Sequence, residues 1–168
     1  MSGTERALEA LAAEVGARLR ERGWMLATAE SCTGGWISAA VTSIAGSSEW
    51  FDRGFVTYSN DAKRQMLGVS ARSLDEHGAV SESVVREMAL GALAASAAHV
   101  AVAVSGIAGP GGGSAEKPVG TVCFAWAVRG GDVRCVTRHF DGDRRAVRWH
   151  TVEHALREIL TCVPPSGA

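Results

Sequence analysis

The apolar residues near the N-terminus recur every three or four positions. Between Thr4 and Gly23 they are Leu8, Leu11, Ala12, Val15 and Leu19. This spacing places them on one face of a helix, and the glycine supplies its end. We therefore predict an amphipathic helix over this segment. Similar helical patterns predict further helices within residues 31–46, 59–69, 81–98 and 144–160.

Short apolar runs lie between these helical segments and predict strands. They cover residues 24–30, 51–58, 100–104, 121–128 and 133–140, and the last two are joined by the hairpin signal RGGD. Strands alternate with helices through the middle of the chain, which is typical of parallel pairing. We predict an α/β fold: a single-domain sandwich over residues 1–168, with a mixed, mainly parallel sheet flanked by helices.

One nearly uncharged stretch, Met88–Val104, raises the question of a membrane span. It is shorter than the roughly 20 apolar residues that a spanning helix needs, and it contains Ser96 and His99. Alanine also dominates where leucine would be expected. We interpret it as the end of a helix followed by a buried strand, and we expect no membrane partner.

Composition narrows the class of protein further. The chain has 168 residues, 46% of them hydrophobic, which suffices for one core and argues against disorder. Its 17 basic and 18 acidic residues give a net charge of −1, without a run of like charges, so we expect no nucleic-acid partner. The four cysteines are widely spaced and no export signal is visible, which favours free thiols and a cytoplasmic location.

The histidines offer one possible pair of metal ligands. His150 and His154 are four residues apart on a predicted helix, but the glutamate of the HExxH zinc motif is missing. Histidines exposed on a helix explain this spacing better than a metal site does. We predict no metal and no cofactor.

Three polar segments follow predicted strands: residues 30–35, 58–63 and 105–113. In open α/β sheets ligands collect at the carboxyl ends of strands. In the first segment, Ser31 precedes a predicted helix whose free N–H groups, from about Cys32 to Gly35, could stabilise a developing negative charge. Ser31 is therefore a candidate nucleophile. The structural alternative, that Ser31 or Thr33 only caps the helix, stays open at this stage, and Cys32 is a weaker rival because no histidine is near it in the motif.

A serine nucleophile needs a base, and no histidine occurs in the three segments. Lys63 is a candidate if its surroundings lower its pKa by about 3 units. Only two of the 17 basic residues, Lys63 and Lys117, are lysines, and arginine could not take this role because it does not deprotonate. Tyr58, the only tyrosine, could relay a proton. An exposed helix lysine and an ordinary strand aromatic are the structural alternatives.

The third segment belongs to a glycine-rich stretch, SGIAGPGGGSAEKPVG, at residues 105–120. It matches neither the P-loop pattern nor a GxGxxG fingerprint that opens a helix. Its exposed N–H groups could bind a ligand, although a flexible surface loop explains it equally well. Ser105 would present its hydroxyl near Ser31 if their strands are neighbours. Arg144, Arg145 and Arg148 could reach a phosphate or could form a solvated helix face.

Together, four ordered motifs resemble the C-terminal domain of the competence/damage-inducible protein CinA, a family of nicotinamide mononucleotide amidases. They are TAESCTGG at 28–35, FDRGFVTYSNDAKRQMLGV at 51–69, HGAVSESVVREMA at 77–89 and SGIAGPGGGSAEKPVGTV at 105–122. The resemblance covers a core of about residues 7–160. It implies hydrolysis of nicotinamide mononucleotide to nicotinic acid mononucleotide and ammonia, with a small-molecule nucleotide as substrate. Larger members carry an additional N-terminal domain linked to pyrophosphatase activity, which we do not expect here.

Carried over by position, the family's catalytic residues fall on Ser31, Lys63 and Tyr58. The resemblance also suggests a set of substrate-binding residues: Glu30, Cys32, Thr33, Gly34, Gly35, Ser105, Gly106, Ala108, Gly109 and Arg145. It implies a homodimer as well. We expect Ser31, deprotonated by Lys63 directly or through Tyr58, to attack the carboxamide. The rival hypotheses are a non-catalytic nucleotide-binding or regulatory module and a hydrolase of another amide.

Overall fold

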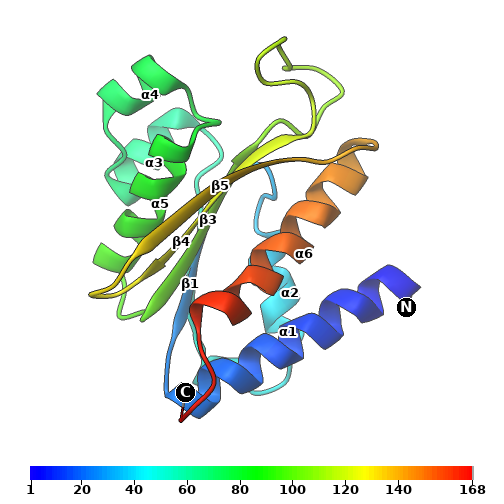
Figure 1. Cartoon of the computed structure of the whole chain (residues 1–168), viewed down its shortest axis with the longest axis vertical. Helices are drawn as coiled ribbons and strands as arrows, with labels where there is room; N and C mark the ends of the chain where they lie inside the picture. Colours follow the sequence, from blue (N-terminus) through cyan, green and yellow to red (C-terminus); the bar gives the residue numbers. More distant parts are fainter. Residues whose placement is uncertain (168) are drawn as a thin grey trace.

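The computed structural model describes residues 1–167 and shows helices on both sides of one sheet (Figure 1). In chain order the elements are α1 (Gly3–Arg22), β1 (Leu26–Glu30), α2 (Trp36–Thr42), a 3-10 turn (Ser47–Glu49), β2 (Phe51–Val56), α3 (Asn60–Leu67), α4 (Ala71–His77), α5 (Glu82–Ala94), β3 (Val100–Gly106), β4 (Thr121–Val128), β5 (Val133–His139) and α6 (Arg144–Cys162). In the described part of the chain, no helix combines the length and apolar character needed to cross a bilayer.

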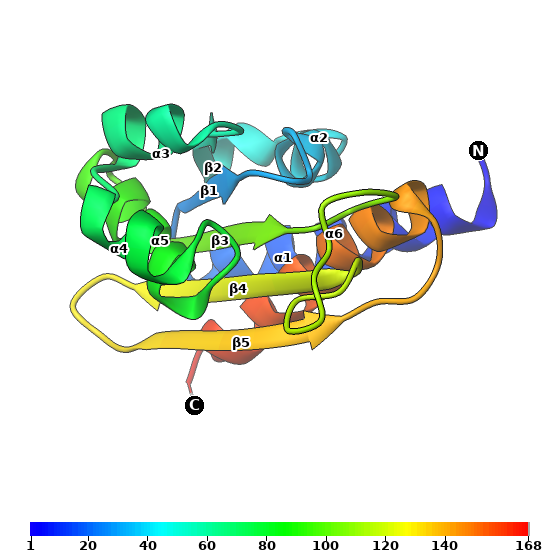
Figure 2. The same ribbon diagram turned by 90° about the horizontal axis from the view of Figure 1, so that it is seen from above.

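The sheet has five strands in the order β2-β1-β3-β4-β5. The strand β1 pairs in parallel with β2 and β3, whereas β4 pairs antiparallel with β3 and β5. Figure 2 shows the alternation: the arrowhead of β4 points opposite to those of β3 and β5. The prediction of a mixed sheet is confirmed, but the prediction that it is mainly parallel is wrong. No helix joins β3 to β4 or β4 to β5, and without a crossover the chain returns antiparallel.

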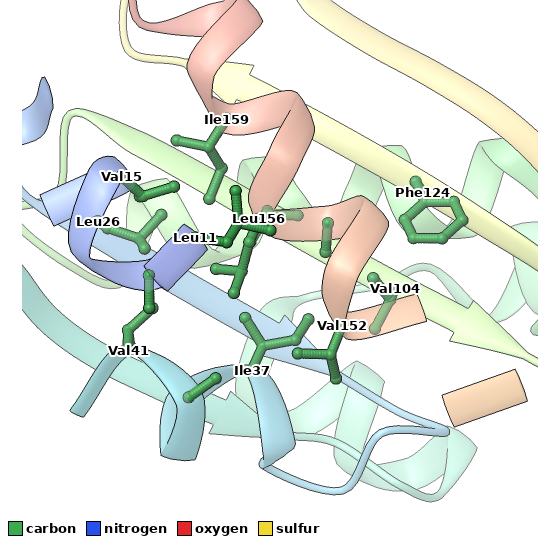
Figure 3. Packing of buried hydrophobic residues seen from close by; sticks show 14 of the residues in the cluster. Leu11, Val15, Leu26, Ile37, Val41, Val104, Phe124, Val152, Leu156 and Ile159 are labelled. Atoms are coloured by element: carbon green, nitrogen blue, oxygen red, sulfur yellow. The ribbon is translucent and has the colours of Figure 1, made fainter. Parts of the chain in front are cut away.

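The two faces of the sheet bury different side chains. Large apolar residues of the strands face α1, α2 and α6, and alanines face α5. The first face receives Leu26, Val100, Val102, Val104, Phe124 and Trp126, and Figure 3 shows part of this packing. The second receives Ala27, Ala29, Ala101, Ala103, Ala125 and Ala127. Because alternate residues of a strand point to opposite faces, the Val-Ala alternation of β3 sorts its side chains in this way.

Close packing continues between α3 and α5 on the alanine face. A Cβ atom added to Gly91 of α5 would lie 2.0 Å from the carbonyl oxygen of Leu67, so the backbones approach too closely for any other residue. This contact fixes α3 against α5, which itself packs on the sheet. The position of α3 matters because its first turn carries Lys63.

Candidate active site

The strands β1, β2 and β3 end at the same edge of the sheet. Glu30, the last residue of β1, is level with Val56 of β2 and with Val104 of β3. The segments after these strands therefore emerge side by side, as expected for parallel neighbours. They contain the three polar segments that the sequence singled out.

A cavity of about 210 Å³ opens where these segments meet. Its lining residues are Ser31, Cys32, Tyr58, Asn60, Lys63, Ala79, Val80, Ser105, Gly106, Ala108 and Arg144. The structure thus brings the sequence-predicted residues Ser31, Lys63, Tyr58 and Ser105 into one cavity. Ser105 is buried at the end of β3, next to the turn that carries Ser31.

Ser31 and Lys63 are in direct contact at the base of this cavity. The distance from Lys63 Nζ to Ser31 Oγ is 2.9 Å. Ser59 caps α3 by accepting a hydrogen bond from the backbone N–H of Ala62, so the helix begins close to the end of β2. Lys63, in the first turn of α3, then extends toward β1. Direct contact makes a relay through Tyr58 unnecessary for proton transfer between the two side chains.

The surroundings of Lys63 favour a neutral amine. The side chain is only 1% exposed, and Nζ contacts the carbonyl oxygens of Thr57 at 2.9 Å and Tyr58 at 3.3 Å in addition to Ser31. Within residues 1–167 it forms no ion pair with a carboxylate. Removal from water disfavours the ammonium form, so burial lowers the pKa of Lys63 from its ordinary value of 10.5.

The turn that carries Ser31 is built around a buried carboxylate. Glu30 accepts hydrogen bonds from the backbone N–H groups of Ile37 and Ser38, at 2.8 and 3.0 Å. It also accepts from the hydroxyls of Thr33 and Ser38, at 2.7 and 2.8 Å. A carboxylate at the start of a helix satisfies N–H groups that have no partner within the helix. Both oxygens of Glu30 are occupied, and its side chain points away from the cavity into the protein.

The hydrogen bonds of this turn determine which backbone N–H groups remain free to bind a substrate. The first N–H groups of α2 are engaged by Glu30 and by the carbonyl of Thr33, so they are not available to a substrate. In the turn itself, the N–H of Gly34 donates to the carbonyl of Ser31 at 3.0 Å. Among the hydrogen bonds of residues 1–167, none uses the backbone N–H of Cys32. Since Cys32 also lines the cavity, its N–H is the best-placed candidate for an oxyanion donor.

The Cys32 thiol itself is poorly suited to nucleophilic attack. Burial raises its pKa to about 12, so it stays protonated at neutral pH. In contrast to Cys32, Tyr58 is 61% exposed, and its hydroxyl accepts a hydrogen bond from Nη2 of Arg144 at 3.1 Å. Tyr58 therefore lies at the mouth of the cavity, away from the contact between Ser31 and Lys63.

Two arginines of α6 reach the site from a distant part of the sequence. Arg144 also donates to the carbonyl of Gly109 at 2.7 Å, and so links the glycine-rich loop to Tyr58. Arg148, one turn further along the helix, donates to the carbonyls of Cys32 and Thr33 at 3.0 and 2.9 Å. The capping of α6 by Asp143, which accepts from the N–H of Ala146, fixes where this helix begins.

Other sequence-predicted residues do not reach the cavity. Glu30 and Thr33 are buried beneath the turn, Gly34 and Gly35 form its bend at positive φ, and Gly109 meets Arg144 through its carbonyl. Arg145 lines a separate cavity of about 670 Å³ between α1, α2 and α6, together with Trp36 and Trp149. That larger cavity contains neither Ser31 nor Lys63. The role of Arg145 in binding substrate stays a prediction.

Four residues of the cavity were missed as individual site residues. Asn60 lies within the second polar segment, and Ala79 and Val80 lie within the motif HGAVSESV. The sequence had therefore marked the segments that contain these three residues. Arg144 was noted only as one of three clustered arginines. Its place at the site depends on how α6 packs, which helical spacing alone cannot specify.

Comparisons with known proteins identify close relatives. The family profile described as "CinA C-terminal domain" matches residues 8–163. The nicotinamide-nucleotide amidohydrolase PncC of Enterobacter agglomerans is 58% identical over 94% of this chain and 98% of its own length. That of Escherichia coli K12 is 56% identical over 93% and 94%. The crystal structure of the competence/damage inducible protein CihA from Agrobacterium tumefaciens is 52% identical, with a TM-score of 0.89 and coverage of 94% and 95%.

Proposed function

The chain belongs to the CinA C-terminal domain family, and on this premise we propose that it hydrolyses the carboxamide of nicotinamide mononucleotide, giving nicotinic acid mononucleotide and ammonia. Two relatives named as nicotinamide-nucleotide amidohydrolases are 56–58% identical over nearly the whole chain, which supports this substrate. The single observation that carries the chemistry is the 2.9 Å contact between Ser31 Oγ and Nζ of the buried Lys63.

The three oxygen partners of Lys63 Nζ can accept from the three donors of an ammonium, and they also fit a neutral amine, the form that burial favours. Such an amine has two N–H donors and one lone pair. The carbonyls of Thr57 and Tyr58 can only accept hydrogen bonds, and so they take the two donors. The lone pair is then directed at Ser31, whose hydroxyl can donate. In this state Lys63 is ready to act as a general base.

The reaction then proceeds by acyl transfer. Lys63 Nζ takes the hydroxyl proton of Ser31 while Oγ forms a bond to the carboxamide carbon, and the carbonyl oxygen becomes an oxyanion near the N–H of Cys32. When this intermediate collapses, the C–N bond breaks and the Lys63 ammonium returns its proton to the departing nitrogen, which leaves as ammonia. Lys63 next deprotonates a water that attacks the acyl group, and finally passes that proton to Ser31.

The dimensions of the cavity suggest how the nucleotide lies. At about 210 Å³ it is smaller than the roughly 300–1,000 Å³ of pockets that enclose most of a drug-sized ligand. We therefore place the nicotinamide ring inside, over Ser31, and the ribose phosphate at the mouth. Arg144 is the only arginine among the lining residues and is exposed there, so it is our candidate for a phosphate contact.

The direct test is ammonia release from nicotinamide mononucleotide by the purified protein. We expect turnover of the mononucleotide and much poorer turnover of nicotinamide riboside, because the riboside lacks the phosphate. Binding without ammonia release would favour the non-catalytic nucleotide-binding module instead. Equal turnover of both compounds, or turnover of an unrelated amide alone, would favour a hydrolase with another substrate.

A further inference from the structure

Arg148 holds the backbone of the nucleophile turn although it does not line the cavity. Its Nε and Nη2 groups donate to the carbonyls of Cys32 and Thr33, at 3.0 and 2.9 Å. The guanidinium also stacks over the Trp36 ring, 5.3 Å from its centroid. One half-buried side chain of α6 thus contacts Cys32, Thr33 and Trp36, three residues of the segment that starts at Ser31.

We propose that Arg148 is a positioning residue for the reaction, acting by fixing the two peptide groups that follow Cys32, those on either side of Thr33. For its kinetic consequence this inference rests on the proposed function. Arg148 touches neither the cavity nor the reacting atoms, so its effect passes through the turn. The N–H of Cys32 belongs to the one residue among Cys32, Thr33 and Gly35 that lines the cavity, and Arg148 helps to fix its direction by holding the next peptide.

Peptide geometry explains how this control works. In a trans peptide the C=O and the N–H point in opposite directions. The carbonyl of Ser31 is held on one side by the N–H of Gly34, so the N–H of Cys32, in the same peptide, must point to the other side. Arg148 holds the next carbonyl, that of Cys32, and so prevents rotation about the Cys32 backbone. Both peptide groups next to Cys32 are therefore fixed.

Glu30 and the N–H groups of Gly34 and Trp36 hold the turn on either side, but within residues 1–167 only Arg148 donates to the Cys32 carbonyl. Gly34 and Gly35 follow with φ values of 59° and 100°, and glycine imposes few restrictions on the backbone. Without Arg148 the carbonyls of Cys32 and Thr33 would lose their side-chain donor. A misplacement of about 1 Å near a reacting centre can cost about 100-fold in rate. Arg148 supplies the restraint that the glycines do not.

Arginine is specifically suited to this task. Its planar guanidinium offers several N–H groups in a fixed arrangement and can stack on a ring at the same time, whereas lysine presents a compact ammonium. In this structure two carbonyls accept from the N–H groups of Arg148 while the Trp36 ring stacks on its guanidinium plane. Replacement by lysine should therefore restore only part of the function that alanine removes.

The kinetic test compares Arg148→Ala, Arg148→Lys and the native protein in ammonia release. We expect Arg148→Ala to lower kcat by about 10- to 100-fold with KM nearly unchanged. Arg148→Lys should fall between the two, and guanidinium ion at low millimolar concentration should partly restore Arg148→Ala. A raised KM with unchanged kcat would overturn the proposal, since it would make Arg148 a substrate-binding residue.

Arg157→Ala is the matched control. Arg157 is an exposed residue of the same helix and pairs with Glu153, so its replacement also removes one guanidinium from α6. We expect native kcat and no response to guanidinium ion. A loss of kcat equal to that of Arg148→Ala would show that the effect belongs to α6 in general and would contradict the proposal.

A second measurement does not depend on any activity. In hydrogen exchange of the protein alone, the amides of Gly34 and Trp36 report on the turn, because they donate to the carbonyls of Ser31 and Thr33 at 3.0 and 3.1 Å. We expect faster exchange in residues 31–38 of Arg148→Ala and not of Arg157→Ala. Unchanged exchange would overturn the positioning role. If the native protein released no ammonia, the proposed function would fail while this test of Arg148 remained decisive.

Discussion

At the scale of single residues, Lys63 shows how burial converts a common surface residue into a candidate base. An exposed lysine carries a proton at neutral pH, because its pKa is near 10.4. Lys63 is enclosed, and among the described residues 1–167 its hydrogen-bond partners are two carbonyls and the Ser31 hydroxyl. Neither kind of group compensates the cost of an ammonium as a carboxylate would.

The pH dependence of the rate follows from this environment. The proposed base must be neutral, and burial lowers the pKa of Lys63, so kcat/KM should rise with pH and reach a plateau below the ordinary lysine value of 10.5. The profile of kcat/KM from pH 5.5 to 10 measures this. Lys63→Arg, which keeps the charge but cannot lose its proton, should remove the activity at every pH. A value of kcat/KM that still rises in proportion to hydroxide concentration up to pH 10, without approaching a plateau, would contradict the role of Lys63.

Sequence reasoning was most informative at this scale. The scarcity of lysine, the lack of histidine at the strand ends and the CinA resemblance together predicted Ser31 and Lys63, which the structure places in contact. It was least informative for Arg144 and Arg148. These residues lie more than 80 positions from their partners Tyr58 and Cys32, so only the packing of α6 brings them together.

At the scale of elements, the turn between β1 and α2 depends on Glu30. Each carboxylate oxygen accepts one backbone and one side-chain hydrogen bond, and the side chain is fully buried. We predict that Glu30→Gln destabilises the protein by about 2–4 kcal/mol, because an amide replaces one accepting oxygen by a donor that faces other donors. Urea unfolding measures the loss. Glu21→Gln, at an exposed position of α1, is the control and should change the midpoint little; equal midpoints for all three proteins would contradict the prediction.

Two helices, α4 and α5, differ from what the local sequence pattern predicts. The pattern predicted a helix as far as Ala98, but α5 ends at Ala94, where Arg129 donates to the carbonyls of Leu93 and Ser96. The short helix α4 was not predicted at all. Its capping residue Ser70 is held by Glu87 of α5, so a tertiary contact stabilises its start. Both differences arise from partners that are distant in sequence.

His154 of α6 packs against Phe124, Trp126 and Phe140 in an aromatic cluster, and its titration should affect stability. Burial lowers the pKa of His154 below its ordinary value of 6.5, and its ring packs edge-on against Phe124 at 4.7 Å. The unfolded chain therefore binds a proton more readily than the folded one, so stability is lost as pH falls through about 6.5. When the pH is lowered from 7.5 to 5.5, the free energy of unfolding should fall less for the His154→Phe variant than for the native protein.

Urea unfolding at the two pH values measures this difference, and His77→Gln serves as the control. His77 lies at the exposed end of α4, outside the aromatic cluster. Its variant should follow the native protein at both pH values. An identical acid-dependent loss in His154→Phe and in the native protein would show that protonation of His154 does not limit stability.

At the scale of the whole molecule, the alternation of large and small side chains decides the architecture. Valines on one face of β3 support α1 and α6, and alanines on the other allow α5 to approach closely. The sequence predicted a mixed α/β sheet, but its pairing depends on connections. The return of β4 beside β3 follows from a loop without a helix, which the pattern of strands and helices had not distinguished from parallel pairing. The homodimer implied by the family resemblance stays a prediction, and light scattering in solution tests it.

The central claim is that Ser31 and Lys63 work as one unit, and a double-mutant cycle in ammonia release tests it most directly. The variants are Ser31→Ala, Lys63→Met and the double variant, each shown to be folded by circular dichroism. Residues that act together are strongly non-additive, so each single change should lower kcat by at least about 1,000-fold and the double variant should lose little more. Losses that multiply in the double variant, or a single variant that keeps near-native kcat, would contradict the account.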